Sequence, residues 1–188
     1  MSPVENGKES EREINAIIKN TPTESHALAR AQSSVCTGTF ARGRWLSYSE
    51  PADLRIIGTS IQFGHQHNGW ESWTNFPSEI RKMVDLIKET RAGGVVFVSG
   101  DVHWAELSVL KAEGCYPLHD LTASGINRDW DVLEPNRNRV GEACMDHHFG
   151  QIEIDWSLDD PVVTFGVQDV DQRTRLERKV ALSALKLP

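Results

Sequence analysis

Residues 95–107 read VVFVSGDVHWAEL, an apolar run that ends in a polar turn. The run is rich in Val and Phe, which is the composition of a buried β-strand. Gly100 lets the backbone turn sharply off the strand, and Asp101 and His103 follow on the same side of that turn. A carboxylate and an imidazole in this arrangement can bind calcium, iron, manganese or zinc. They can equally form an ordinary polar loop at a strand end.

A βαβ unit is predicted around this run. The segment LRIIGTSIQF (54–63) is apolar and β-branched, as buried strands are. The segment FPSEIRKMVDLIKET (76–90) has the apolar spacing of a helix and places Pro77 in its first turn. Strand, helix and strand in this order predict two parallel strands, and ligands of such sheets gather at the carboxyl ends of the strands. Asp101 and His103 follow such an end.

The remainder of the C-terminal part predicts further strands. The segments ELSVLK (106–111) and PLHDLTASG (117–125) alternate in the manner of strands separated by a turn. The segments FGQIEIDWS (149–157) and VVTFGVQDV (162–170) predict a hairpin, because the LDDP between them is typical of a turn. The last segment, RTRLERKVALSALK (173–186), fits either a strand or a helix.

The first fifty residues have a less regular pattern. KESEREINAIIKN (8–20) predicts a short helix and TPTESHALARAQ (21–32) a second one, whereas residues 33–51 are typical of a loop. A chain of 188 residues is expected to form one domain. Within it we distinguish a poorly defined N-terminal segment, 1–50, from a better defined part, 51–188.

Composition excludes several classes of function. The net charge of −7 argues against binding to nucleic acid, which relies on clustered Lys and Arg. Cys36, Cys115 and Cys144 are too few and too dispersed for a disulfide framework or a zinc knuckle. No apolar run approaches the ~20 residues of a membrane helix. The acidic, polar start does not have the pattern of a signal peptide, so we expect no membrane partner and, by default, a cytoplasmic location.

Several stretches together resemble one enzyme family. VVFVSGDVHWAELS, from residue 95, resembles the Gly-Asp-x-His motif of alkaline phosphatase D-type (PhoD-like) metallophosphoesterases. Four further stretches agree in the same order along the chain: PADLRIIGTSIQ, GWESWTNFPSEIRKMVDLI, YPLHDLTASGI and HHFGQIEIDW. The resemblance runs from about Pro51 to the C-terminus.

This resemblance implies a fold, a reaction and two site residues. The implied fold is α/β, a partial βαβ-sandwich of the calcineurin-like metallophosphoesterase type, with mixed sheets and flanking helices. The implied activity is hydrolysis of small phosphate monoesters or diesters by a hydroxide generated at two metal ions. Calcium and iron are the metals expected for this family, and manganese or zinc are alternatives. Asp101 would bind one metal ion and His103 the other.

The sequence also departs from the family. The other ligands of the family come earlier in the chain, in an Asp-x-His-type motif, a Gly-Asp-x-x-Asp motif and a Gly-Asn-His motif, and none of these precedes Gly100. Two side chains cannot supply the ligands that two metal ions need. The sequence therefore resembles the C-terminal half of such an enzyme and provides only part of its metal site. It identifies no catalytic nucleophile, general acid or substrate-binding residue.

Two alternatives follow from that departure. The chain could be a binding or structural module that has lost catalysis together with the missing ligands. It could also be half of an enzyme that another chain completes. Sheet edges left open by an absent half would favour self-association.

The loop after residue 63 holds the next candidates. His65 and His67 have a His-x-His spacing that can bind a metal, although exposed loop histidines are common. Trp70 and Trp73 are expected to pack against the sheet or the helix, and tryptophans can also line ligand pockets.

Two further motifs are interpreted as structural. Asp146, His147 and His148 contain an Asp-x-His spacing, but they follow the Gly-Asp-x-His motif and directly precede a strand. A serine hydrolase is excluded because no Gly-x-Ser-x-Gly elbow is present. The residues of suitable type for it are Ser99, Ser124, His119 and Asp120.

Overall fold

Two β-sheets and one α-helix form most of the structure, a computed structural model that describes residues 16–21, 31–35, 52–66, 70–128 and 130–188. The elements in chain order are β1 (Ala16–Thr21), β2 (Ala31–Val35), β3 (Leu54–Gly58), the 3-10 turn η1 (Trp73–Asn75), α1 (Pro77–Glu89), β4 (Val95–Ser99), β5 (Ala105–Leu110), β6 (Leu118–Ala123), β7 (Arg139–Cys144), β8 (His148–Asp155), β9 (Val162–Asp169), β10 (Thr174–Ala181) and η2 (Leu182–Leu185).

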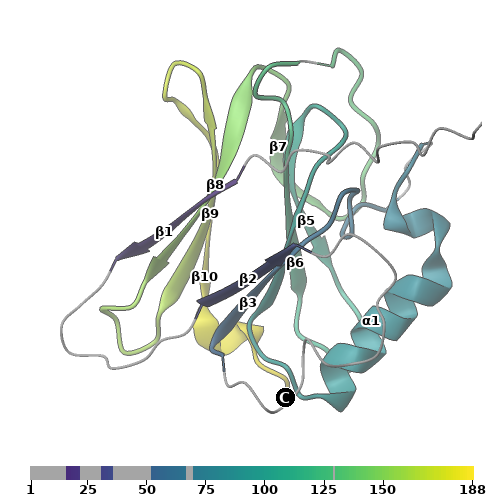
Figure 1. The fold of residues 1–188 in the computed structure, drawn as a ribbon, viewed down its shortest axis with the longest axis vertical. Coiled ribbons are helices and arrows are strands. Elements are labelled where there is room, and N and C mark those ends of the chain that lie inside the picture. The colour runs from purple at the N-terminus through teal and green to yellow at the C-terminus, as the bar shows by residue number, and fades with distance from the viewer. Residues whose placement is uncertain (1–15, 22–30, 36–51, 67–69, 129) are drawn as a thin grey trace, which may run out of the picture.

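The two sheets face one another, and α1 lies on the far side of the larger one (Figure 1). The larger sheet is mixed, with six strands in the order β2-β3-β4-β6-β5-β7, and the smaller sheet has four in the order β1-β8-β9-β10. The predicted class, α/β with mixed sheets and a flanking helix, is confirmed.

The predicted βαβ unit is present. β3 and β4 run parallel, with Arg55 opposite Val95. Between them α1 begins at Pro77 and buries one face through Met83, Val84 and Ile87. β4 also pairs in parallel with β6, and all five of its residues are buried. A strand covered on both faces needs apolar side chains throughout, which explains the unbroken VVFV run.

Gly94 forms the turn into β4 at a position where no side chain fits. Its φ is +66°, and a Cβ there would lie 2.0 Å from the carbonyl oxygen of Asp53. Gly114 has a similar φ of +68°, but its Cβ would first meet the flexible end of Lys88, at 3.5 Å. We expect Gly94→Ala to lower the free energy of unfolding by at least ~2 kcal/mol more than Gly114→Ala does, measured by urea denaturation. Equal losses would mean that φ alone determines the cost.

The N-terminal prediction is wrong where the structure describes it. β1 covers the end of the first predicted helix and the first residue of the second, and it pairs in parallel with β8. β2 pairs in parallel with β3. β2 also takes in the end of the second predicted helix and the start of the predicted loop, while residues 22–30 and 36–51 lie outside the described part. The AII of β1 suits a strand, and pairing with a distant partner overrides the local helical spacing.

The C-terminal prediction is largely confirmed. β8 and β9 form the predicted antiparallel hairpin, with Ile152 opposite Phe165. The ambiguous last segment is a strand, β10, which pairs antiparallel with β9 and ends in η2. β7 was not predicted, because its sequence RVGEAC has no apolar alternation and contains Gly141 at a φ of +77°.

No helix in the described ranges is long and apolar enough to cross a membrane. Cys115 and Cys144, the two cysteines within those ranges, are free thiols, and burial raises the pKa of both. Cys36 lies outside the described residues.

Candidate functional site

Asp101 and His103 lie directly after β4, where its carboxyl end opens into a loop. Their φ angles are +80° and +59°, in the left-handed region that residues with a side chain seldom adopt. Such conformations persist only where the surroundings impose them, and they cluster at functional sites. One restraint is visible, since the backbone N–H of His103 donates to Ser124 Oγ at 3.2 Å.

Both residues line the same cavity. The cavity has a volume of about 270 Å³. The ring of His103 meets Trp130 edge-on, with 6.0 Å between ring centroids. Further parts of the wall come from the loop before η1 and the loop after β6. The described lining residues are Trp70, Glu71, Asp101, Val102, His103, Trp104 and Trp130.

A two-metal centre does not fit the described residues by themselves. Across the part of the chain that the structure describes, no group of three or more His, Cys, Asp or Glu side chains is placed to hold a metal ion. Two metal ions bridged in one site require more ligands than one carboxylate and one imidazole. Asp101 and His103 therefore form at most part of such a centre.

His65 does not join this site. Its side chain is buried, with Nε2 3.7 Å from Glu106 Oε1, and it is not among the described residues of the cavity wall. The expectation of a solvent-exposed loop histidine is wrong at this position. His67 lies outside the described residues.

Trp73 and Trp70 behave differently from one another. Trp73 packs edge-on against Phe63, with 5.3 Å between ring centroids, as predicted. Trp70 is 72% exposed, so the expectation that it packs against the sheet or helix is wrong. It forms part of the cavity wall instead.

A buried polar network is centred on two carboxylates of the larger sheet. Glu106 on β5 is fully buried and accepts hydrogen bonds from Gln62 Nε2 and Asn136 Nδ2, both at 2.9 Å, and from Arg139 Nε. Asp120 on β6 accepts the backbone N–H groups of Phe63 and Gly64, at 2.8 and 2.7 Å. Burial raises the pKa of Asp120 to about 6, despite these hydrogen bonds. The signal that could have revealed both residues is a carboxylate within an otherwise apolar strand.

The serine-hydrolase residues do not assemble into a triad. Ser99 Oγ donates to Asp120 Oδ1 at 2.8 Å, but His119 stacks on Phe165 of the other sheet, with 5.3 Å between ring centroids. Neighbouring residues of a strand point to opposite faces, so His119 and Asp120 cannot act on one serine. Burial lowers the pKa of His119 to about 4.

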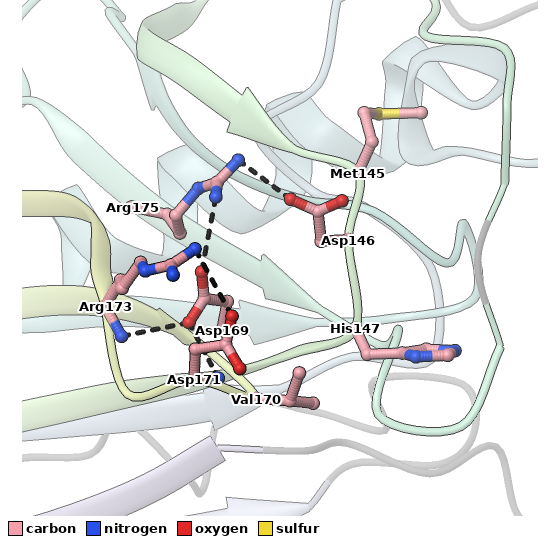
Figure 2. A pocket seen from close by; sticks show the side chains of 8 residues that line it. All are labelled: Met145, Asp146, His147, Asp169, Val170, Asp171, Arg173 and Arg175. Atoms are coloured by element: carbon pink, nitrogen blue, oxygen red, sulfur yellow. Dashed lines mark hydrogen bonds and ion pairs between the residues drawn. The ribbon is translucent and has the colours of Figure 1, made fainter.

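A second cavity, of about 350 Å³, surrounds the Asp146 region (Figure 2). Arg175 on β10 forms ion pairs with Asp146 at 2.8 Å and with Asp169 at 3.2 Å, which ties the ends of β9 and β10 to the turn between β7 and β8. Asp169 also accepts the N–H groups of Asp171 and Arg173, both at 2.9 Å. Figure 2 shows the ring of His147 directed away from this cluster.

His148 has a structural role, as predicted. Its ring is buried, Nε2 accepts the N–H of Gly125 at 3.1 Å, and Nδ1 donates to the carbonyl of Asp146 at 2.7 Å. A ring that donates from one nitrogen and accepts at the other is neutral, and burial lowers the pKa of His148 accordingly.

No known protein-family model matches the sequence, and no curated protein matches it. A solved structure of PhoD is similar, with a TM-score of 0.45 and 18% identity over 73% of this chain and 34% of that chain. A structure of GAP50, described as the anchor in the inner membrane complex of Plasmodium, has a TM-score of 0.45 and 15% identity over 73% of this chain and 38% of that chain. The chain thus spans less than two fifths of either structure's length. The similarity is a distant one and assigns no activity.

Proposed function

We propose that this chain is part of a phosphate-ester hydrolase, to which it contributes Asp101 and His103 as metal ligands. The observation that carries the proposal is the left-handed backbone at both residues, within one cavity at the carboxyl end of β4. The Gly-Asp-x-His motif supports it from the sequence. The substrate would be a small phosphate monoester or diester. The metal would be calcium or iron, with manganese and zinc as alternatives.

The rest of the centre must come from outside the described residues. Those residues could lie in the segments that the structure leaves undescribed, or in another chain that pairs with an open sheet edge. Within the described part, Asp101 offers a carboxylate oxygen and His103 an imidazole nitrogen, and Glu71 borders the same cavity.

A binding module without catalytic activity is the second candidate. The observation that favours it is the scarcity of ligating groups, because no described cluster reaches three. The cavity would then serve recognition alone, through the tryptophans that form much of its wall.

The Asp101→Asn variant tests the metal site. We expect the full chain to hydrolyse bis(p-nitrophenyl) phosphate or p-nitrophenyl phosphate when calcium, iron, manganese or zinc is added. Asp101→Asn should lower that rate by at least about 100-fold, because loss of mere outer-shell partners of a metal already costs roughly 10–100-fold. Asp85→Asn, on the exposed side of α1, is the matched control and should retain the wild-type rate.

Calorimetric titration of each metal separates the remaining outcomes. Metal binding that Asp101→Asn abolishes, without hydrolysis by the wild type, would favour the binding module. Equal metal affinity and equal activity in wild type and Asp101→Asn would refute the metal-site proposal.

A further inference from the structure

Two adjacent residues that follow β6 contact the backbone of His103 on both sides of its Cα. The φ of His103 is +59°, a conformation that costs energy for a residue with a side chain. Its N–H donates to Ser124 Oγ at 3.2 Å. Its carbonyl oxygen packs against Gly125, since a Cβ added to that glycine would lie 2.6 Å from the oxygen. Ser124 and Gly125 therefore restrain both polar groups of the His103 backbone.

Gly125 is in turn held by His148, which belongs to the smaller sheet. The N–H of Gly125 donates to His148 Nε2 at 3.1 Å, and the N–H of His148 donates to the carbonyl of Gly125 at 3.2 Å. The ring of His148 is buried, and its Nδ1 donates to the carbonyl of Asp146 at 2.7 Å. Because both ring nitrogens have hydrogen-bond partners, the ring cannot turn aside without losing them.

The close packing at residue 125 leaves no room for a side chain. A Cβ there would lie 2.4 Å from Cε1 and 2.9 Å from Nδ1 of His148, besides its contact with the carbonyl oxygen of His103. These distances are far inside the optimum of about 3.5–4.0 Å between non-bonded carbon atoms. One neighbour is backbone and the other is a buried ring with two hydrogen bonds. Any side chain at residue 125 would therefore displace His103, His148 or both.

The backbone conformation of His103 determines where its imidazole lies. The imidazole forms part of the cavity wall, where it meets Trp130 edge-on. A change of φ from the left-handed region to the common helical or extended regions would rotate the Cα–Cβ bond relative to the flanking peptides. The imidazole would then leave its place in the wall. A residue with a side chain remains left-handed only where its surroundings impose that conformation.

We propose that Ser124, Gly125 and His148 form a positioning clamp that imposes the left-handed backbone of His103 and so sets the place of its imidazole. Ser124 accepts the N–H, Gly125 leaves room for the carbonyl, and His148 fixes Gly125 from the smaller sheet. The clamp thus connects that sheet to the candidate site. The role of the imidazole as a metal ligand rests on the proposed function, whereas the clamp itself is a property of the metal-free chain.

NMR spectroscopy of the metal-free, isotope-labelled full chain tests the clamp. A strong NOE between the amide proton and the Hα of one residue marks a positive φ, because the two protons are then closest. We expect this NOE at His103 in the wild type, and we expect Gly125→Ala to reduce it to the intensity of an ordinary strand residue. Gly93→Ala is the matched control, because its added Cβ would meet its nearest neighbour, the carbonyl oxygen of Leu185, at 3.5 Å. An unchanged NOE in a folded Gly125→Ala chain would overturn the proposal.

Variants of Ser124 test the clamp independently, even where Gly125→Ala does not fold. Ser124→Ala removes the acceptor of the His103 N–H, so hydrogen exchange of that amide should accelerate by at least about 5-fold, the effect of losing one ordinary hydrogen bond. Ser124→Thr keeps the hydroxyl and should restore the protection. A merely structural role of Ser124 would speed the exchange of all amides of β4 and β6 alike. That result, or equal protection of His103 in Ser124→Ala and wild type, would contradict the clamp.

Calorimetric titration with calcium, iron, manganese and zinc connects the clamp to the proposed metal site. Ser124→Ala should weaken the affinity of the wild type for its metal by about 10-fold, the lower end of the losses that outer-shell partners cause. Ser124→Thr should restore the affinity. Equal affinities in wild type and Ser124→Ala would show that the clamp does not position the imidazole. A wild type that binds no metal would refute the proposed function, while the NOE and exchange measurements would still decide the clamp.

Discussion

Truncation of Glu106 to alanine is expected to lower the free energy of unfolding by about 3–5 kcal/mol, the usual cost of removing one partner of a buried ion pair. Glu106 is fully buried, and three side-chain donors, from Gln62, Asn136 and Arg139, converge on its carboxylate. The variant removes the counter-ion of a largely buried guanidinium and one of the two acceptors of each amide, since Gln62 Nε2 keeps Thr122 Oγ1 and Asn136 Nδ2 keeps Ser108 Oγ. Urea denaturation monitored by circular dichroism measures the loss.

A double-mutant cycle separates this electrostatic loss from the loss of volume. The variants are Glu106→Leu, Arg139→Leu and the double substitution. We expect the double variant to be more stable than the sum of the single losses predicts, by at least about 2 kcal/mol, because apolar side chains of similar volume can replace a buried ion pair. The exposed pair of Glu79 and Lys82 on α1 is the control, and Glu79→Ala should cost less than about 0.5 kcal/mol. Strict additivity at Glu106 and Arg139 would contradict the coupling.

The second large effect is the pH dependence of stability. Two adjacent residues of β6, Asp120 and His119, contribute to it in opposite directions. Burial raises the pKa of Asp120 to about 6, against about 3.9 in an unfolded chain. The folded protein therefore holds a proton there that the unfolded chain releases between pH 4 and 6, and stability falls as pH rises through that window. Asp120→Asn removes the dependence. Its stability relative to wild type should rise by on the order of 3 kcal/mol from pH 4 to pH 7.

His119 acts in the opposite direction. Its pKa is lowered to about 4, against about 6.5 in an unfolded chain. Between these two pH values the unfolded chain binds a proton that the folded protein does not bind. Wild-type stability from this residue is present above pH 6.5 and is lost as pH falls towards 4. His119→Gln should therefore gain on the order of 3 kcal/mol relative to wild type from pH 7 to pH 4.

Urea midpoints of both variants between pH 4 and pH 7.5 test this pair. In the wild type the two contributions largely cancel within the same window, so the wild-type profile alone does not reveal them. If the urea midpoints of Asp120→Asn, His119→Gln and wild type changed with pH in parallel, the shifted pKa values of Asp120 and His119 would be contradicted.

Local patterns predict most of the larger sheet. β3, β4, β5 and β6 are apolar segments of strand length, and α1 has a clear helical period with proline at its start. The same patterns fail for β1, which pairs with a strand more than a hundred residues further along the chain. Pairing over that separation depends on tertiary contacts that no local period encodes.

The sequence predicts the motif of the candidate site but not all of the residues that line its cavity. Asp101 and His103 follow from a ligand-type pair after an apolar strand. Trp104 and Trp130 were not anticipated, since a tryptophan in a loop is equally compatible with packing against the core. The burial of Glu106 and Asp120 depends on which loops close over the sheet, and those loops come from other parts of the chain.

The alternation of His119 and Asp120 also favours the correct register of β6 during folding. A slip of one residue would turn the carboxylate of Asp120 towards Phe165 and remove it from the N–H groups of Phe63 and Gly64. The same slip would place the imidazole of His119 where an acceptor is required. A chain with this register slip would bury two polar groups without their partners, which destabilises the wrong pairing of β6 relative to the observed one.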